Sequence, residues 1–219
     1  MSGFFSSSIG KKYLMGLSGL VWAGFVFGHM AGNMTILISP DLYNRYGHAI
    51  VSNKPLLYGT EAILILSIIV HVALAINLTI TNRRAKGHVM LQRPEGPKRT
   101  SLASQTMIVQ GSILLVFIIT HLMTFKFGAY YETTVDGVVM RDLAKLMKEV
   151  FTQPLAVGWY ILSLFLLFAH LKHGFGSVFQ SLGLLHPAYQ NKIKAASWGY
   201  AIVVTLGFVS QPLYVFIAG

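Results

Sequence analysis

The sequence predicts an all-α integral membrane protein with five transmembrane helices. Of its 219 residues, 54% are hydrophobic and only 11% are charged, whereas a soluble domain carries about 25% charged residues. The hydrophobic residues gather in five runs, and a helix of about 20 apolar residues is long enough to cross a bilayer core of about 30 Å. The chain has no cysteine, which excludes disulfides and any iron–sulfur cluster or haem held by its own thiolates.

The five runs, taken in chain order, define the expected spans: 12–38, 56–82, 101–126, 154–178 and 197–217. The first run is not expected to be a cleaved signal peptide, because it is too long and lacks a small-residue cleavage site. The spans leave no room for a separate soluble domain. We therefore expect residues 1–219 to form a single transmembrane domain.

Basic residues lie in alternate loops of this arrangement. They precede the first span, fill the link between the second and third spans, and precede the fifth: Lys11, Lys12, Arg83, Arg84, Lys86, Arg93, Lys98, Arg99, Lys192 and Lys194. The opposite loops contain most of the acidic residues: Asp41, Glu132, Asp136, Asp142 and Glu149. The positive-inside rule then predicts a cytoplasmic N-terminus and an extracytoplasmic C-terminus in a bacterial cytoplasmic (inner) membrane. A net charge of +10 distributed in this way argues against a nucleic-acid partner; the basic loops would set the topology alone, or would also contact anionic lipid or a protein partner.

The longest outer loop, 128–152, contains a helical pattern. Its apolar residues recur at helical spacing among charged ones: Leu143, Leu146, Met147, Val150 and Phe151. This pattern predicts a short amphipathic helix lying on the outer surface.

Each of the first four spans contains a histidine: His29, His71, His121 and His170. Ionisable side chains within membrane spans usually mark a functional site, and neutral imidazole is a common axial ligand of haem iron. From the helical rise, the first and third histidines lie about 25–33 Å from the cytoplasmic charges, and the other two about 18–20 Å. The pattern therefore predicts an outer pair, His29 with His121, and an inner pair, His71 with His170, which would bind two haems b.

A lone histidine in a membrane helix more often forms a hydrogen bond to a neighbouring helix, and the sorting into depth-matched pairs is what favours a cofactor. His173 lies one turn after His170 and competes with it as a ligand, or would bond a haem propionate. The histidines in loops are expected to be solvated: His48, His88 and His186.

Small residues accompany two of the candidate ligands. Gly174 follows His170 by four residues and lies on the same helix face, where a larger side chain would project toward a porphyrin. Gly24, Gly28 and Gly32 form a stripe beside His29. Such a stripe lets a flat macrocycle approach the backbone, although helix packing is its more common cause.

Four motifs along the chain resemble those of a known family. They are Phe-Gly-His29-Met-Ala-Gly-Asn, Ile-Val-His71-Val-Ala-Leu, Ile-Thr-His121-Leu and Ala-His170-Leu-Lys-His-Gly174-Phe-Gly. In order and placement they resemble the five-helix, two-haem cytochrome b anchor of succinate dehydrogenases and fumarate reductases that have a single anchor polypeptide. In that family a glycine follows the fourth ligand by four residues, which favours His170 over His173, and the ligands pair as the depths above indicate.

The resemblance implies a place in a respiratory complex. A flavoprotein subunit would act on succinate or fumarate in the cytoplasm, and an iron–sulfur subunit would relay electrons to this chain. The inner haem would exchange electrons with the iron–sulfur subunit, and the outer haem with a membrane quinone, which is the substrate here. Menaquinone and ubiquinone, both directions of reaction, and a higher oligomer of the complex stay open.

Glu61 is the only acidic residue in a predicted span, about one turn inside the outer end of the second. Quinone chemistry moves protons, so Glu61 is the candidate for quinone-linked proton exchange; the alternative is an interfacial glutamate facing headgroup water. Tyr43, Tyr46 and His48 in the adjacent loop would help to enclose a quinone. Residues 164–169 are wholly apolar, so the glutamate that some relatives carry on this helix is absent.

Two other functions fit the same pattern. One is a di-haem cytochrome b anchor of a different quinone-linked dehydrogenase. The other is a haem-free proton-coupled carrier in which the histidines act as relays.

Overall fold

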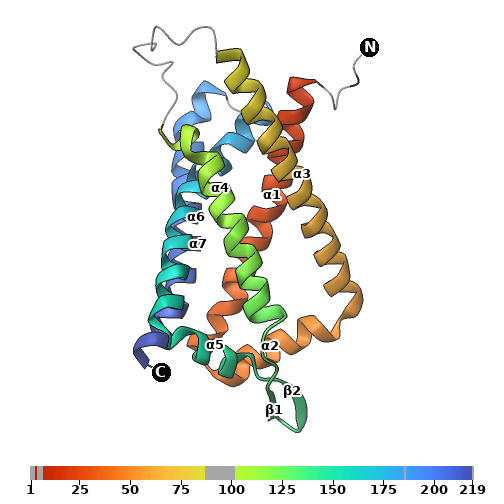
Figure 1. Ribbon diagram of the computed structural model, residues 1–219, viewed down its shortest axis with the longest axis vertical. Coiled ribbons are helices and arrows are strands. Elements are labelled where there is room, and N and C mark those ends of the chain that lie inside the picture. Colours follow the sequence, from red (N-terminus) through yellow and green to blue (C-terminus); the bar gives the residue numbers. More distant parts are fainter. Residues whose placement is uncertain (1–2, 4–6, 87–101, 185, 219) are drawn as a thin grey trace.

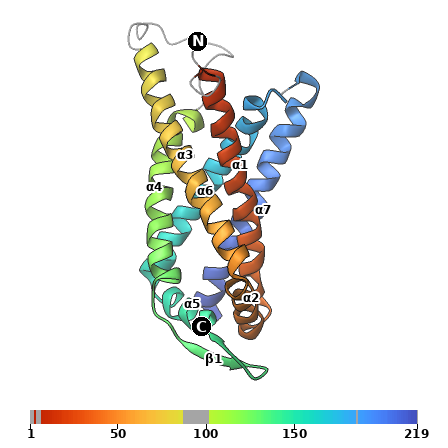
Figure 2. The ribbon, with the colours of Figure 1, turned by 90° about the vertical axis from the view of Figure 1, so that its right-hand side faces the viewer.

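A computed structural model of the chain describes residues 3, 7–86, 102–184 and 186–218. Five long helices run side by side in one elongated bundle (Figures 1 and 2): α1 (Ser8–Asn33), α3 (Lys54–Lys86), α4 (Leu102–His121), α6 (Pro154–Ser181) and α7 (Gln190–Ala218). Within the described residues, five segments are long and apolar enough to cross a membrane: Ile9–Leu37, Lys54–Asn82, Thr106–Lys126, Pro154–Ser181 and Pro187–Ala218. The predicted all-α class with five spans is confirmed, and the chain is a multi-pass membrane protein.

The helix ends differ from the predicted ends for local reasons. Ser7 caps α1 by accepting a hydrogen bond from the Gly10 N–H at 3.0 Å, so this helix begins four residues before the predicted span 12–38. Lys11 then reaches across to α3, where its Nζ donates to Asn77 Oδ1 at 3.0 Å. At the other end of the chain, a 3-10 turn (Pro187–Tyr189) leads directly into α7, so Lys192 and Lys194 lie in this helix and not in a loop before it.

The bundle is centred on α1 and α6. Helix α1 packs against α3, α6 and α7, and α6 also packs against α4 and α7. Ser163, Ala201 and Val204 are fully buried between α6 and its neighbours. Small residues permit the close crossings, since a Cβ at Gly176 of α6 would lie only 3.1 Å from Ser197 Oγ of α7.

One end of the bundle has an additional layer (Figure 1). It consists of a 3-10 turn (Met34–Leu37), α2 (Pro40–Ser52), a π-helical turn (Leu122–Lys126), a hairpin of β1 (Glu132–Val135) and β2 (Val138–Arg141), and α5 (Leu143–Phe151). The C-terminus also lies at this end, which we call the C-terminal end; the N-terminus lies at the other, the N-terminal end.

The segment expected to be a loop after the first span is instead helix α2. Ser39 caps it, accepting from the Leu42 N–H at 3.1 Å, and Pro40 occupies its first position. Asn44 in the middle of α2 is buried: its Nδ2 donates to Asp142 Oδ1 at 3.0 Å and its Oδ1 accepts from the Ala144 N–H at 2.9 Å. The same asparagine therefore joins α2 to the start of α5.

Helix α5 confirms the predicted amphipathic helix, but its apolar face packs against protein. It contacts α2, α6 and α7. Residues from the 3-10 turn, α2, α5, α6 and α7 form one buried cluster, the C-terminal-end core: Ile36, Tyr43, Ala144, Met147, Phe151, Val157, Tyr160 and Val215. Helix α5 therefore lies across one end of the bundle, with α2 as a partner that the sequence pattern did not reveal.

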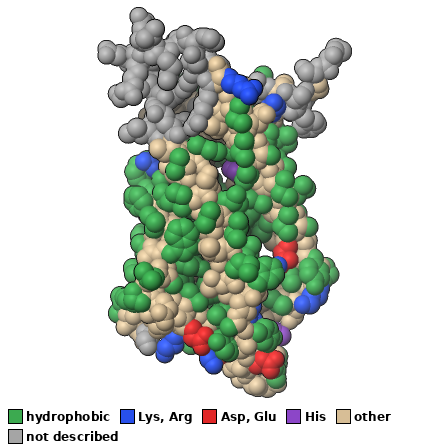
Figure 3. Space-filling view, viewed as in Figure 1, with side chains coloured by type: hydrophobic (Ala, Val, Ile, Leu, Met, Phe, Trp, Pro, Cys, Tyr) green, Lys and Arg blue, Asp and Glu red, His purple; other side chains and the backbone are tan. Residues whose placement is uncertain are grey.

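Charge divides between the two ends. Hydrophobic side chains cover most of the bundle between them, and charged side chains gather toward the ends (Figure 3). The helix ends at the N-terminal end carry basic residues, among them Lys11, Lys12, Arg84, Lys192 and Lys194. At the C-terminal end acidic and basic residues mix, as in the ion pair of 2.6 Å between Arg45 of α2 and Asp136 in the hairpin turn.

Candidate functional site

The structure brings the four predicted histidines together as two facing pairs. His29 of α1 lies opposite His121 of α4, with ring centres 5.8 Å apart, and His71 of α3 lies opposite His170 of α6, with ring centres 6.4 Å apart. The first pair lies toward the C-terminal end and the second toward the N-terminal end. We call them the C-terminal pair and the N-terminal pair. His173 lies one turn further along α6, so His170 is the residue that faces His71.

Both separations fit two imidazoles on opposite sides of one metal ion. An imidazole–metal bond of about 2.0–2.1 Å places the centres of two such rings about 6.3 Å apart. Groups of three or more metal-ligating side chains are absent from the described residues. Each pair therefore offers two side-chain nitrogen ligands.

The helices that carry each pair are held apart. The closely packed helix pairs include neither α1 with α4 nor α3 with α6. The facing rings therefore bridge backbones that do not themselves pack. Gly24, Gly28 and Gly174 reinforce this arrangement, because a Cβ added at any of the three would meet nothing within 4 Å. Gly32 differs, since the ring of Tyr46 packs directly on it, so the predicted stripe contacts α2 at one end and meets open space at the other.

The hydrogen bonds of Ser18 favour one tautomer of His71 in the N-terminal pair. Ser18 of α1 donates its hydroxyl proton to the Met15 carbonyl at 3.0 Å, and its Oγ lies 3.2 Å from His71 Nδ1. Because the hydroxyl proton is already used, the oxygen accepts from Nδ1–H. The proton on Nδ1 leaves Nε2 free as a ligand nitrogen. The opposite ring is less constrained: His170 Nδ1 is buried with no hydrogen-bond partner among the described residues.

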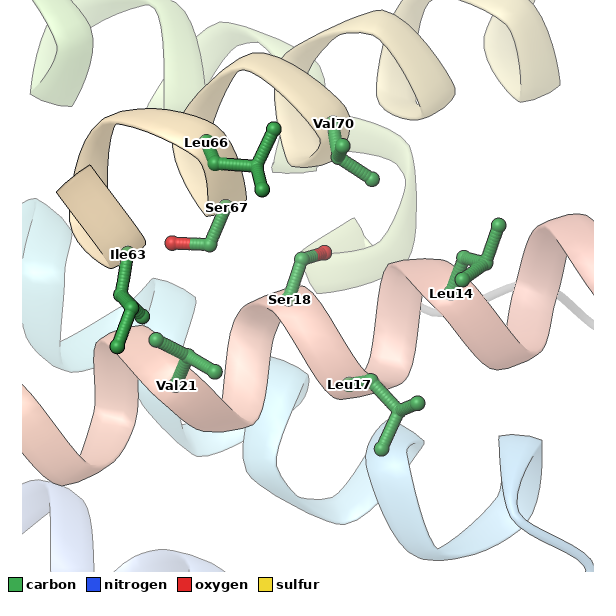
Figure 4. A pocket seen from close by; sticks show the side chains of 8 residues that line it. All are labelled: Leu14, Leu17, Ser18, Val21, Ile63, Leu66, Ser67 and Val70. Carbon is green, nitrogen blue, oxygen red and sulfur yellow. The ribbon is translucent and has the colours of Figure 1, made fainter.

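An apolar groove between α1 and α3 borders the N-terminal pair (Figure 4). Four residues of each helix line it, including Ser18 and Ser67. Both hydroxyls donate to carbonyls of their own helices at 3.0 Å, so the groove presents mostly apolar atoms. Helix α1 also passes close to the His71 ring, since a Cβ at Gly19 would lie 3.3 Å from His71 Cε1.

The C-terminal pair has partners from outside its own two helices. Tyr160 of α6 places its hydroxyl 3.1 Å from His121 Nδ1. Asn33 lies one turn after His29. Its Nδ2 lies 3.2 Å from His29 Nε2, and its Oδ1 accepts a hydrogen bond from the Tyr43 hydroxyl at 3.0 Å. Burial raises the pKa of the Tyr43 phenol, so this hydroxyl keeps its proton and acts as the donor.

Glu61 lies at the C-terminal end, where it forms an ion pair with Lys126. Lys126 is the last residue of the π-helical turn that follows His121. Arg141 of the hairpin contacts the end of this turn and the segment after it, with Nη1 donating to the Lys126 carbonyl at 3.5 Å and Nη2 to the Ala129 carbonyl at 2.8 Å. The predicted proton-exchange residue is therefore connected to the segment that ends α4, a link the sequence did not reveal.

The other predicted residues are placed as follows. Tyr43, Tyr46 and His48 lie on α2 rather than in a loop, and only His48 lines a small pocket, together with Gly47, Val51, Tyr130, Arg141 and Leu143. His48 is half-buried and its Nε2 lies 3.1 Å from Ser52 Oγ, and His186 is exposed. His88, Arg93, Lys98 and Arg99 lie outside the described residues.

Sequence reasoning missed four residues of this site: Ser18, Asn33, Lys126 and Tyr160. Asn33 had a usable signal, because it follows His29 by four residues and so lies on the same helix face. Tyr160 and Ser18 are far along the chain from the histidines they contact, and no local pattern marks them.

Comparison of the chain with protein-family models, with curated proteins and with solved structures gave no match in any of the three.

Proposed function

We propose that this chain is a two-haem membrane cytochrome b that serves as the anchor and electron-transfer subunit of a succinate:quinone oxidoreductase. The observation that supports it best is the pair of facing histidines at each of two depths, with ring separations of 5.8 and 6.4 Å. The assignment to this class of complex depends in addition on the motif resemblance, above all on the run from His170 to Gly174.

His29 with His121 and His71 with His170 would hold the two haems, which supply one-electron transfer when bound. The chain would contribute ligand nitrogens, their orientation and a water-poor interior. Ser18 keeps the proton of His71 on Nδ1, and Tyr160 contacts the corresponding nitrogen of His121. Gly24, Gly28 and Gly174 leave room beside the ligands at which an ordinary side chain would intrude.

The charge distribution suggests which end meets the partner subunits. By the positive-inside rule, the basic N-terminal end would face the bacterial cytoplasm. The flavoprotein and iron–sulfur subunits would bind there, nearest to the His71–His170 pair. Electrons would then cross to the His29–His121 pair and a membrane quinone at the C-terminal end, where Glu61 would exchange protons with it.

Haem content and dicarboxylate-linked activity test the proposal separately. Pyridine haemochrome analysis of the purified chain should give two haems b per polypeptide, and a value of one or none would refute the four-ligand site. Co-purification with a flavoprotein and an iron–sulfur subunit, together with succinate-dependent reduction of both haems, tests the class of complex. Two haems without any succinate- or fumarate-linked reaction would instead favour the anchor of another quinone-linked dehydrogenase.

A further inference from the structure

The C-terminal-end core contains two tyrosines, and both direct their hydroxyls toward the C-terminal pair. Tyr160 contacts His121 Nδ1 directly at 3.1 Å. Tyr43 reaches the other histidine through Asn33, by donating to Asn33 Oδ1 at 3.0 Å. Both tyrosines are buried, with exposed fractions of 9% and 6%. The apolar cluster that closes this end of the bundle is thus also connected to both histidines.

His121 needs an external contact because of where it lies. It is the last residue of α4, and the next turn, Leu122–Lys126, is a π-helix. A wider turn of this kind changes the direction of side chains and recurs at functional sites. Phe117 and Phe125 lie about the imidazole with ring centres 5.8 and 5.3 Å away. These apolar contacts restrict the ring plane, but they do not determine which nitrogen points which way.

The hydroxyl of Tyr160 can determine which nitrogen of His121 points in which direction. The phenol ring is held edge-on by Phe151 and Phe117, with ring centres 4.8 and 5.0 Å away and interplanar angles of 84° and 81°. A phenol fixed in this way presents its oxygen at one place. If that oxygen accepts from Nδ1–H, the neutral imidazole must keep Nε2 deprotonated, which is the form that binds a metal ion.

We propose that Tyr160 is the positioning residue for His121: its hydroxyl holds Nδ1–H and so presents Nε2 as the ligand nitrogen of the C-terminal pair. This inference depends on the proposed haem function and adds to it a residue from a helix that carries neither ligand of that pair. The N-terminal pair has no equivalent contact at its α6 histidine, since His170 Nδ1 lacks a partner among the described residues.

The test is Tyr160→Phe in the haem-containing full-length chain. Phenylalanine fills the same apolar space, so the bundle should assemble. Loss of a partner of this kind typically weakens metal binding about 10–100-fold, and we expect that loss of haem affinity at the C-terminal pair alone. The midpoint potential of this haem should also rise, because an imidazole without its acceptor donates less electron density to ferric iron.

Tyr200→Phe is the matched control. Its hydroxyl donates to the Ala23 carbonyl at 2.5 Å and contacts no histidine, so both haems should keep their affinity and potential. To tell the two haems apart, the signals of each variant are compared with those of His170→Ala, which should lack the haem of the N-terminal pair. If Tyr160→Phe leaves both potentials and affinities unchanged, or shifts only the other haem, the inference is wrong. Absence of haem from the unmodified chain would instead refute the proposed function.

Discussion

Glu61→Gln distinguishes a proton-exchanging carboxylate from a structural ion pair. The structure shows Glu61 paired with Lys126, and the two side chains remain 31% and 41% exposed. Ion pairs this accessible contribute about 0–1 kcal/mol. If the pair were only structural, its loss would change a rate by less than about tenfold, because 1.4 kcal/mol corresponds to a factor of ten. Loss of a positioned acid–base group costs about 10²–10⁴-fold.

Lys126→Met is the matched variant, because it breaks the same ion pair and leaves the carboxylate in place. We expect quinone-linked turnover to fall about 10²–10⁴-fold in Glu61→Gln and less than about tenfold in Lys126→Met. Reduction of a soluble dye by the dehydrogenase subunits should be unchanged in both variants, and both should retain two haems. The assay is succinate-dependent quinone reduction in the purified complex.

The double variant completes the comparison. If Glu61 exchanges protons, the double variant should be about as slow as Glu61→Gln alone. Equal, small losses in both single variants, with no further loss in the double variant, would show that only the ion pair matters. That outcome would refute the role proposed for Glu61 and direct the search for the quinone site to another part of the bundle.

Three further predictions concern ligand choice, space beside the ligands and stability. His170→Ala should lose the haem of the N-terminal pair and His173→Ala should keep it, as measured by reduced-minus-oxidised spectra; the reverse would overturn the assignment. A Cβ at Gly28 would meet no neighbour within 4 Å, so Gly28→Leu should fold but lose haem at the C-terminal pair, whereas Gly158→Leu, at a position where a Cβ is equally free of neighbours and not beside a ligand, should keep both haems. Asn44→Ala should cost about 1–3 kcal/mol in the free energy of unfolding, because it leaves the buried Ala144 N–H at the start of α5 without its acceptor; thermal denaturation in detergent should show a lower Tm, with exposed Ser52→Ala as the near-neutral reference.

The sequence predicts the membrane-spanning helices well because each span is longer than a bilayer requires and contains few charges. The pairing of His29 with His121 and of His71 with His170 also follows from the sequence, since depth depends only on helical rise and on alternating topology. Contacts such as Tyr160 with His121 do not follow, because they depend on how helices far apart in the chain rotate against each other. Periodicity along one helix carries no information about that rotation.

The hairpin was missed for a different reason. Asp136 and Gly137 have positive φ values of 50° and 78° and join two short antiparallel strands. An Asp-Gly pair between alternating residues is a strong hairpin signal, so this element was predictable from the sequence. In contrast, the sequence signal for α2 is weak. Only Ser39 and Pro40 indicate a helix start, and a polar segment between two spans is typical of a loop.

The two histidine pairs are held in place by contacts with different parts of the bundle. The C-terminal pair is attached through Tyr160 and Asn33 to a core that also includes α2 and α5. The N-terminal pair depends on α1, through Ser18 and the close approach of Gly19 to His71. Substitutions in the C-terminal-end core should therefore alter the first pair and spare the second. The two ends of one membrane domain can thus be adjusted separately, although the same helix, α6, contributes to both.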